Sequence, residues 1–422
     1  MYKMNFINIY KILSVILFWF ITLPFLSCAQ PEKVLKTGAD RLVGDKLKDL
    51  SGKRIALIVN HTSLLSNETH LVDTIFTYRN IKIQKLFSPE HGIRGNADAG
   101  KLINDEIDPA TGLKIVSLYG DNKKPTKEML ADVDVIIYDI QDVGARYYTY
   151  ISTLYYVIES AAENDKKIII LDRPNPIGGE KVEGPVLDLK FKSFIGIAEV
   201  PTRHGMTIGE LALMFNDDIK SKKNISAELE VFNLVNWDRS EYYDAYYSEW
   251  LSPSPNINKL ETAIVYPGTC LIEGTNISEG RGTYEPFLII GAPFINSENL
   301  IDELTEISTD SIILEPIQFT PISINGMSNS PKLKDKVCNG IRITVTDREA
   351  FHPVEFGVNL LSAIIKLYPD EIKFNNDFFD KLAGTDKIRK MLIEKVEPDL
   401  IIQSWQSDLQ NFLDKRNKYL LY

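Results

Sequence analysis

The first half of this chain is predicted to form an α/β fold with a mostly parallel sheet, and two observations predict it. Short apolar runs without polar alternation recur between residues 54 and 172, as expected for strands that are buried on both faces. Stretches with apolar residues at helical spacing separate these runs, which is the alternation of parallel βαβ units. The second half lacks this alternation and is expected to be an α+β auxiliary domain.

The expected elements of the first half follow one another in a regular order. Strands are predicted over residues 54–59, 81–87, 114–120, 133–140 and 166–172. Helices are predicted over residues 71–78, 127–133 and 150–165. Thr207 and Glu210 have the spacing of a capping box, so a further helix should begin there.

The second half begins after a turn-rich boundary segment over residues 250–260. A strand is expected over residues 340–347, and helices over 355–368 and 386–413. The predicted divisions of the chain are therefore a leader over residues 1–28, an α/β domain over 40–250 and an auxiliary domain over 251–422.

The leader reads as a secretory signal. Lys3 and Lys11 precede an apolar stretch over residues 12–26, which is short for a membrane-spanning helix. Cys28 follows Ser27 in a pattern that resembles a loose lipoprotein cleavage site. We therefore expect export to the periplasm and a membrane anchor through acylated Cys28. The alternative is that Cys28 is only the last residue of a cleaved signal.

Charge and missing motifs exclude several classes of protein. The chain has 422 residues with 47 basic and 58 acidic side chains, a net charge of −11. It has no basic block, so nucleic-acid binding is not expected. Three cysteines do not make a disulfide framework. The chain has no GxSxG, no P-loop, no GxGxxG after its first strand and no HExxH, so no cofactor or metal is expected.

Candidate site residues stand just after the predicted strands, where open α/β sheets bind ligands. In chain order they are Asn60, His61, Glu90, His91, Arg94, Asp139, Asp142, Arg146, Asp172, Arg173 and Asn175. Arg203 and His204 precede the capped helix, whose N-terminus attracts anions. A glycine-rich segment of the second half adds Glu273, Asn276, Glu279 and Arg281. We expect these loops to meet at one edge of the sheet.

Carboxylates beside arginines suit glycoside hydrolysis of a charged sugar. Glu90 is the candidate acid, and Asp139 or Asp142 is its partner as nucleophile or base. The arginines are expected to clamp a substrate carboxylate through bidentate contacts. Sequence spacing leaves open whether the reaction retains or inverts configuration. A metal site from His91, Asp139, Asp142 and His204 is an alternative that no ligand spacing supports.

Ten motifs in a fixed order point to one family. They are NHTS, PEHGIRGNADAG, TGLKIVSLYG, DIQDVGARYYTYIST, LDRPNPIGG, VEGP, RHGMTIGELA, PSPN, EGTNISEGRGT and GAPF. Together they resemble the NamZ-type exo-β-N-acetylmuramidases from about Leu42 to the C-terminus. The resemblance implies a Rossmann-like catalytic domain, an auxiliary domain, and release of N-acetylmuramic acid from the non-reducing end of peptidoglycan fragments during cell-wall turnover. The glutamate of the family's PEHG motif, which is proposed as catalytic, falls on Glu90.

The lactyl carboxylate of N-acetylmuramic acid would explain a cleft that holds both acids and arginines. Residues 268–282 are expected to close the pocket at one end, as an exo-acting enzyme requires. A substrate-assisted route, with an aspartate such as Asp139 orienting the acetamido group, is a further alternative. Two other functions compete: a muropeptide-binding lipoprotein without catalysis, and an esterase, which the missing GxSxG motif disfavours.

Overall fold

The structure is a computed structural model that describes residues 34–90, 92–94, 106–120, 122–305 and 310–422. Residues Lys36–Tyr422 form one compact unit, and all contacts given below lie within it. Among the described residues, no helix is long and apolar enough to cross a bilayer. The predicted leader and its Cys28 lie outside the described residues.

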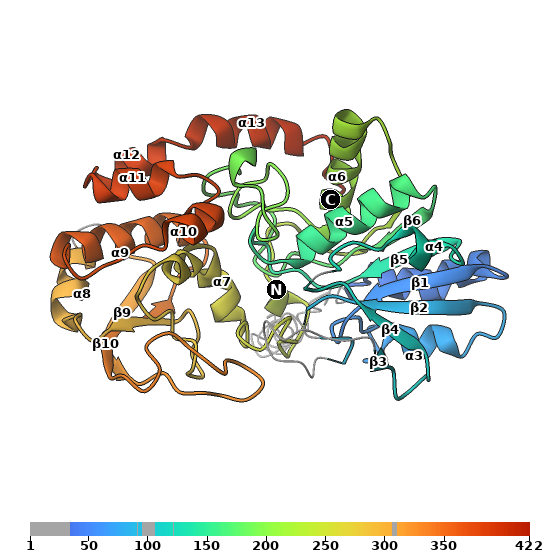
Figure 1. Ribbon diagram of the computed structural model, residues 1–422, viewed down its shortest axis with the longest axis horizontal. Coiled ribbons are helices and arrows are strands. Elements are labelled where there is room, and N and C mark those ends of the chain that lie inside the picture. Colours follow the sequence, from blue (N-terminus) through green and yellow to red (C-terminus); the bar gives the residue numbers. More distant parts are fainter. Residues whose placement is uncertain (1–33, 91, 95–105, 121, 306–309) are drawn as a thin grey trace, which may run out of the picture. The chain divides into compact units, whose positions relative to one another are not determined.

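A seven-stranded sheet organises the first half, in the order β3-β4-β2-β1-β5-β6-β7 (Figure 1). Its strands are β1 Arg54–Val59, β2 Lys82–Ser88, β3 Glu106–Ile107, β4 Lys114–Ser117, β5 Val135–Asp139, β6 Lys167–Leu171 and β7 Glu228–Phe232. Six strands run parallel, and only β3 is antiparallel to its neighbour. The predicted α/β class is confirmed. The strand order reverses between β1 and β5, which is where such sheets bind ligands.

Helices cover both faces of this sheet, which explains why its strands lack polar alternation. The helices are α2 Gly38–Arg41, α3 Leu71–Phe76, α4 Lys127–Leu130, α5 Tyr150–Glu163 and α6 Ile208–Lys223. On one face, Ile55 and Leu57 of β1 join the core that includes α2 and α3. On the other, Ala56 and Ile58 join the core that includes α5 and α6. The side chains of Thr207 and Glu210 do form the predicted capping box of α6.

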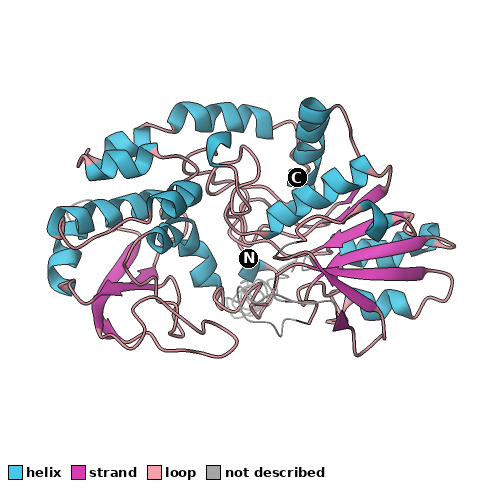
Figure 2. Cartoon of the chain, viewed as in Figure 1, coloured by secondary structure: helices cyan, strands magenta, loops and turns pink. Residues whose placement is uncertain are grey.

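The second half contains a smaller antiparallel sheet with helices, as its α+β prediction requires (Figure 2). The strands β8 Ile289–Ala292, β9 Ile312–Phe319 and β10 Cys338–Val345 pair in the order β8-β10-β9. The helices are α7 Leu260–Thr269, α8 Ser297–Thr305, α9 Pro353–Leu367, α10 Asn376–Ala383, α11 Lys387–Ile393, α12 Pro398–Gln403 and α13 Gln406–Arg416. The single helix predicted over residues 386–413 is thus three helices, with a left-handed residue, Lys395, between the first two.

The two halves are joined by buried polar contacts as well as by one apolar core. The Tyr147 hydroxyl donates to the carbonyl of Tyr266 on α7 at 3.0 Å, and the two rings meet edge to face. The Arg146 guanidinium donates to the carbonyl of Leu382 on α10 at 2.9 Å. The Tyr422 hydroxyl donates to Asp172 at 2.7 Å, at the carboxyl end of β6.

Candidate active site

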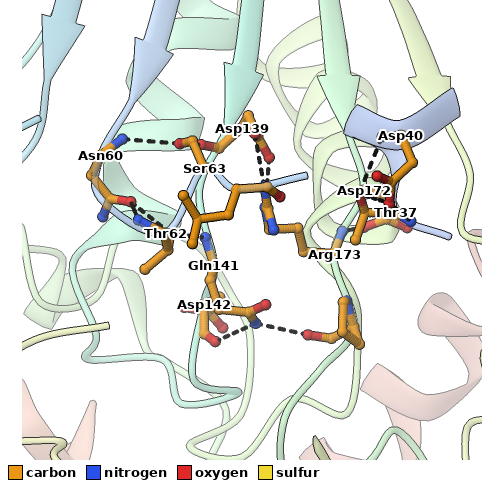
Figure 3. Close-up of polar contacts among 12 residues, drawn as sticks. Thr37, Asp40, Asn60, Thr62, Ser63, Asp139, Gln141, Asp142, Asp172 and Arg173 are labelled. Carbon is orange, nitrogen blue, oxygen red and sulfur yellow. Dashed lines mark hydrogen bonds and ion pairs between the residues drawn. The ribbon is translucent and has the colours of Figure 1, made fainter. Parts of the chain in front are cut away.

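The loop after β1 is tied to the loop after β5 by a chain of short hydrogen bonds (Figure 3). The side-chain oxygen Oδ1 of Asn60 accepts from the backbone N–H and the hydroxyl of Thr62, at 2.9 and 2.6 Å. The same hydroxyl accepts from the Gln141 backbone N–H at 3.1 Å. Ser63 donates to the backbone carbonyl of Asp139 at 2.5 Å. Asn60 is fully buried, yet its side-chain Nδ2 has no hydrogen-bond partner among the described residues.

Asp139 is paired on both carboxylate oxygens. Arg173 donates from Nε to Oδ1 at 2.6 Å and from a terminal nitrogen to Oδ2 at 2.8 Å. The same guanidinium donates to the Leu64 carbonyl at 3.0 Å. Both side chains are buried, so this bidentate pair fixes the ends of β5 and β6 to the β1 loop. The structure gives Asp139 a positioning contact with Arg173, and its expected catalytic role stays a prediction.

One carboxylate oxygen of Asp142 is hydrogen-bonded within the protein, and the other is not. Oδ2 accepts from the Gly144 backbone N–H at 2.7 Å and faces His204 Nε2 at 3.2 Å. Oδ1 is buried and has no hydrogen-bond partner among the residues that the structure describes. The other ring nitrogen of His204 accepts from the Met206 backbone N–H at 3.2 Å. In the neutral imidazole the proton therefore sits on Nε2 and is donated to Asp142.

Glu90 lies directly after β2 and is partly buried. The Thr149 hydroxyl is 3.5 Å from its Oε2. Burial and the charge of Glu90 raise the pKa of Tyr119 to about 12. Burial, followed by the charge of Glu90, also raises the pKa of Tyr150, and the charge of Asp142 adds to it. Glu90 follows β2 and Asp142 follows β5, and both strands pair with β1 in parallel, so the two carboxylates lie at the same edge of the sheet.

The PSPN segment of the sequence adjoins this cluster from the start of the second half. The Tyr150 hydroxyl donates to the Pro253 carbonyl at 3.0 Å. His61, after β1, contacts the Ser252 carbonyl through Nε2 at 2.7 Å. Burial raises the pKa of Tyr148, whose ring packs edge to face on Tyr150. Backbone from residues 252–253 therefore borders the edge of the sheet where Glu90 and Asp142 lie.

The five arginines proposed to bind a substrate carboxylate all have internal partners. Arg94 pairs with Asp73 and Asp108, Arg203 with Glu183, and Arg281 with Glu273. Arg146 is fully buried and donates to the carbonyls of Pro185, Val200 and Leu382. Burial lowers its pKa to about 10. With Arg173 on Asp139, each guanidinium has partners within the protein, and the expected clamp on a substrate carboxylate stays a prediction.

Asp172 and Asn175 also hold structure rather than face the cluster. Asp172 accepts from Thr207, from the backbone N–H groups of Gly209 and Arg173, and from Tyr422. Burial raises its pKa to about 7. Asn175 donates to the Met206 carbonyl and accepts from the Ile177 backbone N–H.

The charges of residues 268–282 have partners within the second half of the chain. Glu279 lies 2.9 Å from Lys332, whose ammonium also donates to the carbonyls of Ile272 and Thr275. Asn276 exchanges hydrogen bonds with the backbone of residues 371 and 373. The predicted end wall stays a prediction, and His91 lies outside the described residues. Within the described part of the chain, no three His, Cys, Asp or Glu side chains form a group that could hold a metal ion.

Sequence reasoning missed three tyrosines and one threonine at this site. These are Tyr119, Tyr148, Thr149 and Tyr150. The run of aromatic residues before α5 has the spacing of core positions, so the sequence indicates core residues there and not site residues. The available signal was its position after β5, on the same edge as the PEHG loop.

The fold and this cluster define a doubly wound α/β protein with an acidic site at its switch point and a smaller α+β part beside it. Residues 55–261 match the family model of the N-terminal part of exo-β-N-acetylmuramidase NamZ, and residues 264–422 match that of its C-terminal part. The chain is 43% identical over 395 residues to peptidoglycan β-N-acetylmuramidase NamZ of Bacillus subtilis (strain 168), covering 93% of this chain and 92% of that protein. This chain therefore belongs to the NamZ family of exo-β-N-acetylmuramidases.

Two crystal structures of DUF1343 family proteins from Bacteroides fragilis NCTC 9343 share this fold. One superposes with a TM-score of 0.85 at 32% identity and covers 93% of this chain and 100% of that one. The other has a TM-score of 0.74 at 34% identity and covers 92% and 99%. The likeness spans both halves of the chain.

Proposed function

We propose that this protein is an exo-acting glycosidase that releases N-acetylmuramic acid from the non-reducing end of peptidoglycan fragments. Family membership over both halves of the chain is the observation that carries the proposal. The acidic cluster at the switch point of the sheet supports it, because glycoside hydrolysis requires a proton donor beside a second carboxylate.

Glu90 is the proposed general acid. It follows β2 in the PEHG motif and lies among hydroxyl groups, with Thr149 at 3.5 Å. The role assigned to it is to supply a proton to the glycosidic oxygen. Transfer of that proton to the leaving oxygen lets the bond to C1 break without forming an alkoxide.

The first experiment measures nitrophenol release from para-nitrophenyl β-N-acetylmuraminide, with the β-N-acetylglucosaminide as the control sugar. Wild type should turn over only the muraminide. Glu90→Gln should lose about 10²–10⁴-fold in kcat on a disaccharide. Its loss on the nitrophenyl sugar should be smaller, because nitrophenolate leaves without help from an acid.

Glu180→Gln is the matched control, since Glu180 is exposed on a loop of the same half. It should retain wild-type rates on both sugars. Absence of turnover of any muraminide by folded wild type would instead support a protein that binds muropeptides without cleaving them.

We also propose export and anchoring through an acylated Cys28, on the sequence of the first 28 residues. Labelling with an alkyne fatty acid should mark the wild-type protein and not Cys28→Ala. Labelling of both forms, or of neither, contradicts the anchor.

A further inference from the structure

Asp142 Oδ1 is a buried carboxylate oxygen without a donor. The whole residue is 4% exposed, and only Oδ2 is hydrogen-bonded. A buried charged oxygen without a partner costs free energy and requires an explanation. Because this oxygen lies in the cluster with Glu90, the missing donor is expected to come from the ligand.

The surrounding structure fixes which oxygen stays bare. Gly144 has a left-handed backbone with φ of 83°, and a methyl group there would lie 2.6 Å from Asn175 Oδ1. A side chain is therefore disfavoured at residue 144, whose N–H points at Asp142 Oδ2. His204 holds the same oxygen through Nε2. Both contacts turn Oδ1 away from the protein's own donors.

We propose that Asp142 Oδ1 accepts the N–H of the substrate's 2-acetamido group, and that the oxygen of this group is the nucleophile at C1. The inference rests on the proposed function and deepens it. In N-acetylmuramic acid the C2 substituent is the donor closest to the reacting carbon, because O3 is capped by the lactyl ether. Glu90 serves the glycosidic oxygen on C1, and the neighbouring C2 substituent then meets Asp142.

The reaction balances with these groups alone. The acetamido oxygen attacks C1, the bond from C1 to the glycosidic oxygen breaks, and the Glu90 proton goes to that oxygen. The positive charge of the resulting oxazolinium ring lies against Asp142, which accepts its N–H. Water then attacks C1 as the Glu90 carboxylate takes a proton from it, and the ring opens to the acetamido group. Two inversions at C1 give a product of retained configuration.

Asp139, the other aspartate considered for this role, is less suited to it, because no oxygen of its carboxylate lacks a donor. Both of its oxygens are held by Arg173 at 2.6 and 2.8 Å. His204 acts through Asp142 and is a positioning residue. Its Nε2 proton keeps Oδ2 of Asp142 engaged.

The test compares para-nitrophenyl muraminides whose acetamido group carries none to three fluorine atoms. Fluorine makes the acetamido oxygen a poorer nucleophile, so wild-type kcat should fall steadily along the series. Proton NMR should show the β-anomer as the first product. Asp142→Asn should lower kcat about 10²–10⁴-fold. It should also weaken the binding of a muramic thiazoline, which mimics the oxazoline. This loss of affinity should be about 10²-fold larger than the loss for free N-acetylmuramic acid.

Two variants make the result specific. Asp188→Asn is the matched control, because Asp188 also accepts a backbone N–H but is exposed on another loop. It should leave kcat and thiazoline binding unchanged. His204→Gln keeps an amide donor, so it should retain more thiazoline affinity than His204→Ala at equal stability.

Each contrary outcome has a distinct meaning. An α-anomer as first product, or a kcat insensitive to fluorination, overturns this inference while the muramidase itself stands. A covalent sugar on Asp142 trapped by a 2-fluoro substrate overturns it too, in favour of a direct nucleophile. If wild type turns over no muraminide at all, the proposed function fails instead.

Discussion

Asp139 and Arg173 bury two opposite charges where two strands end, and they illustrate what a sequence hides at the scale of the residue. Breaking such a pair typically costs about 3–5 kcal/mol, because one charge remains buried alone. An arginine after a strand looks the same whether it will hold a ligand or a neighbouring carboxylate. The positions of these side chains at the sheet edge were predictable, but their pairing depends on geometry between residues 34 apart in the chain.

Asp142 illustrates the reverse case. Its position after β5 made it a candidate from the sequence, but nothing in the sequence distinguished it from Asp139. The distinction is one of hydrogen-bond counting, since Asp139 has donors on both oxygens and Asp142 on one. The two aspartates can therefore be told apart only from the three-dimensional arrangement of their donors.

Asp172 makes stability depend on pH in a direction unusual for a carboxylate. Burial raises its pKa to about 7, against about 3.9 in an unfolded chain. The folded state then binds one more proton than the unfolded state between these values. The stabilisation by the neutral carboxyl is complete below about pH 4 and is lost as pH rises through 7.

Asp172→Asn removes this titration, so its stability relative to wild type should rise with pH. The expected slope is at most about 1.4 kcal/mol per pH unit between pH 4 and 7. Urea unfolding of both proteins at several pH values measures it. A difference between the two proteins that stays constant with pH would contradict a raised pKa.

At the scale of elements, α7 and α9 pack through two facing glycines. A methyl group on Gly268 would lie 1.7 Å from the Pro353 carbonyl oxygen, and one on Gly357 would lie 2.6 Å from the Gly268 carbonyl oxygen. The helices can approach this closely only because neither position has a side chain. The sequence shows these glycines but not the partner that each one touches.

Gly268→Ala should destabilise the protein by about 1–3 kcal/mol or more, although alanine favours helices, because the helices must separate. Gly44→Ala is the control. Gly44 has no atom within 4 Å of the added methyl group, so this change should be neutral or slightly stabilising. Thermal unfolding of the two variants beside wild type tests both expectations. Equal midpoints for the two variants would argue against the close packing.

Strands were the elements best predicted from sequence, for a physical reason. Strands buried on both faces read as continuous apolar runs, and β1 has the predicted bounds of residues 54–59. The edge strand β7 was not predicted, because its exposed and buried residues alternate and the run contains two glutamates. Helix α7 was missed because it contains Pro267 and Gly268 and lies where turns were expected.

At the scale of the molecule, the buried links between the halves predict a single unfolding transition. Arg146 joins loops of the first half to the Leu382 carbonyl, and Tyr147 joins α7. If either half unfolded alone, a charged group or a hydroxyl would lose the hydrogen-bond partner that the other half supplies. Calorimetry of a protein beginning at residue 36 should give a van't Hoff enthalpy equal to the calorimetric one.

A fragment over residues 36–250 should fail to fold stably, because it lacks the Leu382 carbonyl and Tyr422. Two resolved calorimetric transitions, or a fragment with a cooperative transition of its own, would contradict this expectation. The predicted division of the chain near residue 250 then describes sequence organisation more than independent folding.

The hydrogen bond between Tyr422 and Asp172 also has a consequence in time. It spans 250 residues, and Arg416 binds the carbonyls of Gly179 and Gly205 across a similar span. Nascent chains usually complete their N-terminal parts first. Here the edge of the first sheet receives its last partners only after the ribosome has made the second half. The first half of such a chain stays incompletely closed until synthesis is nearly finished.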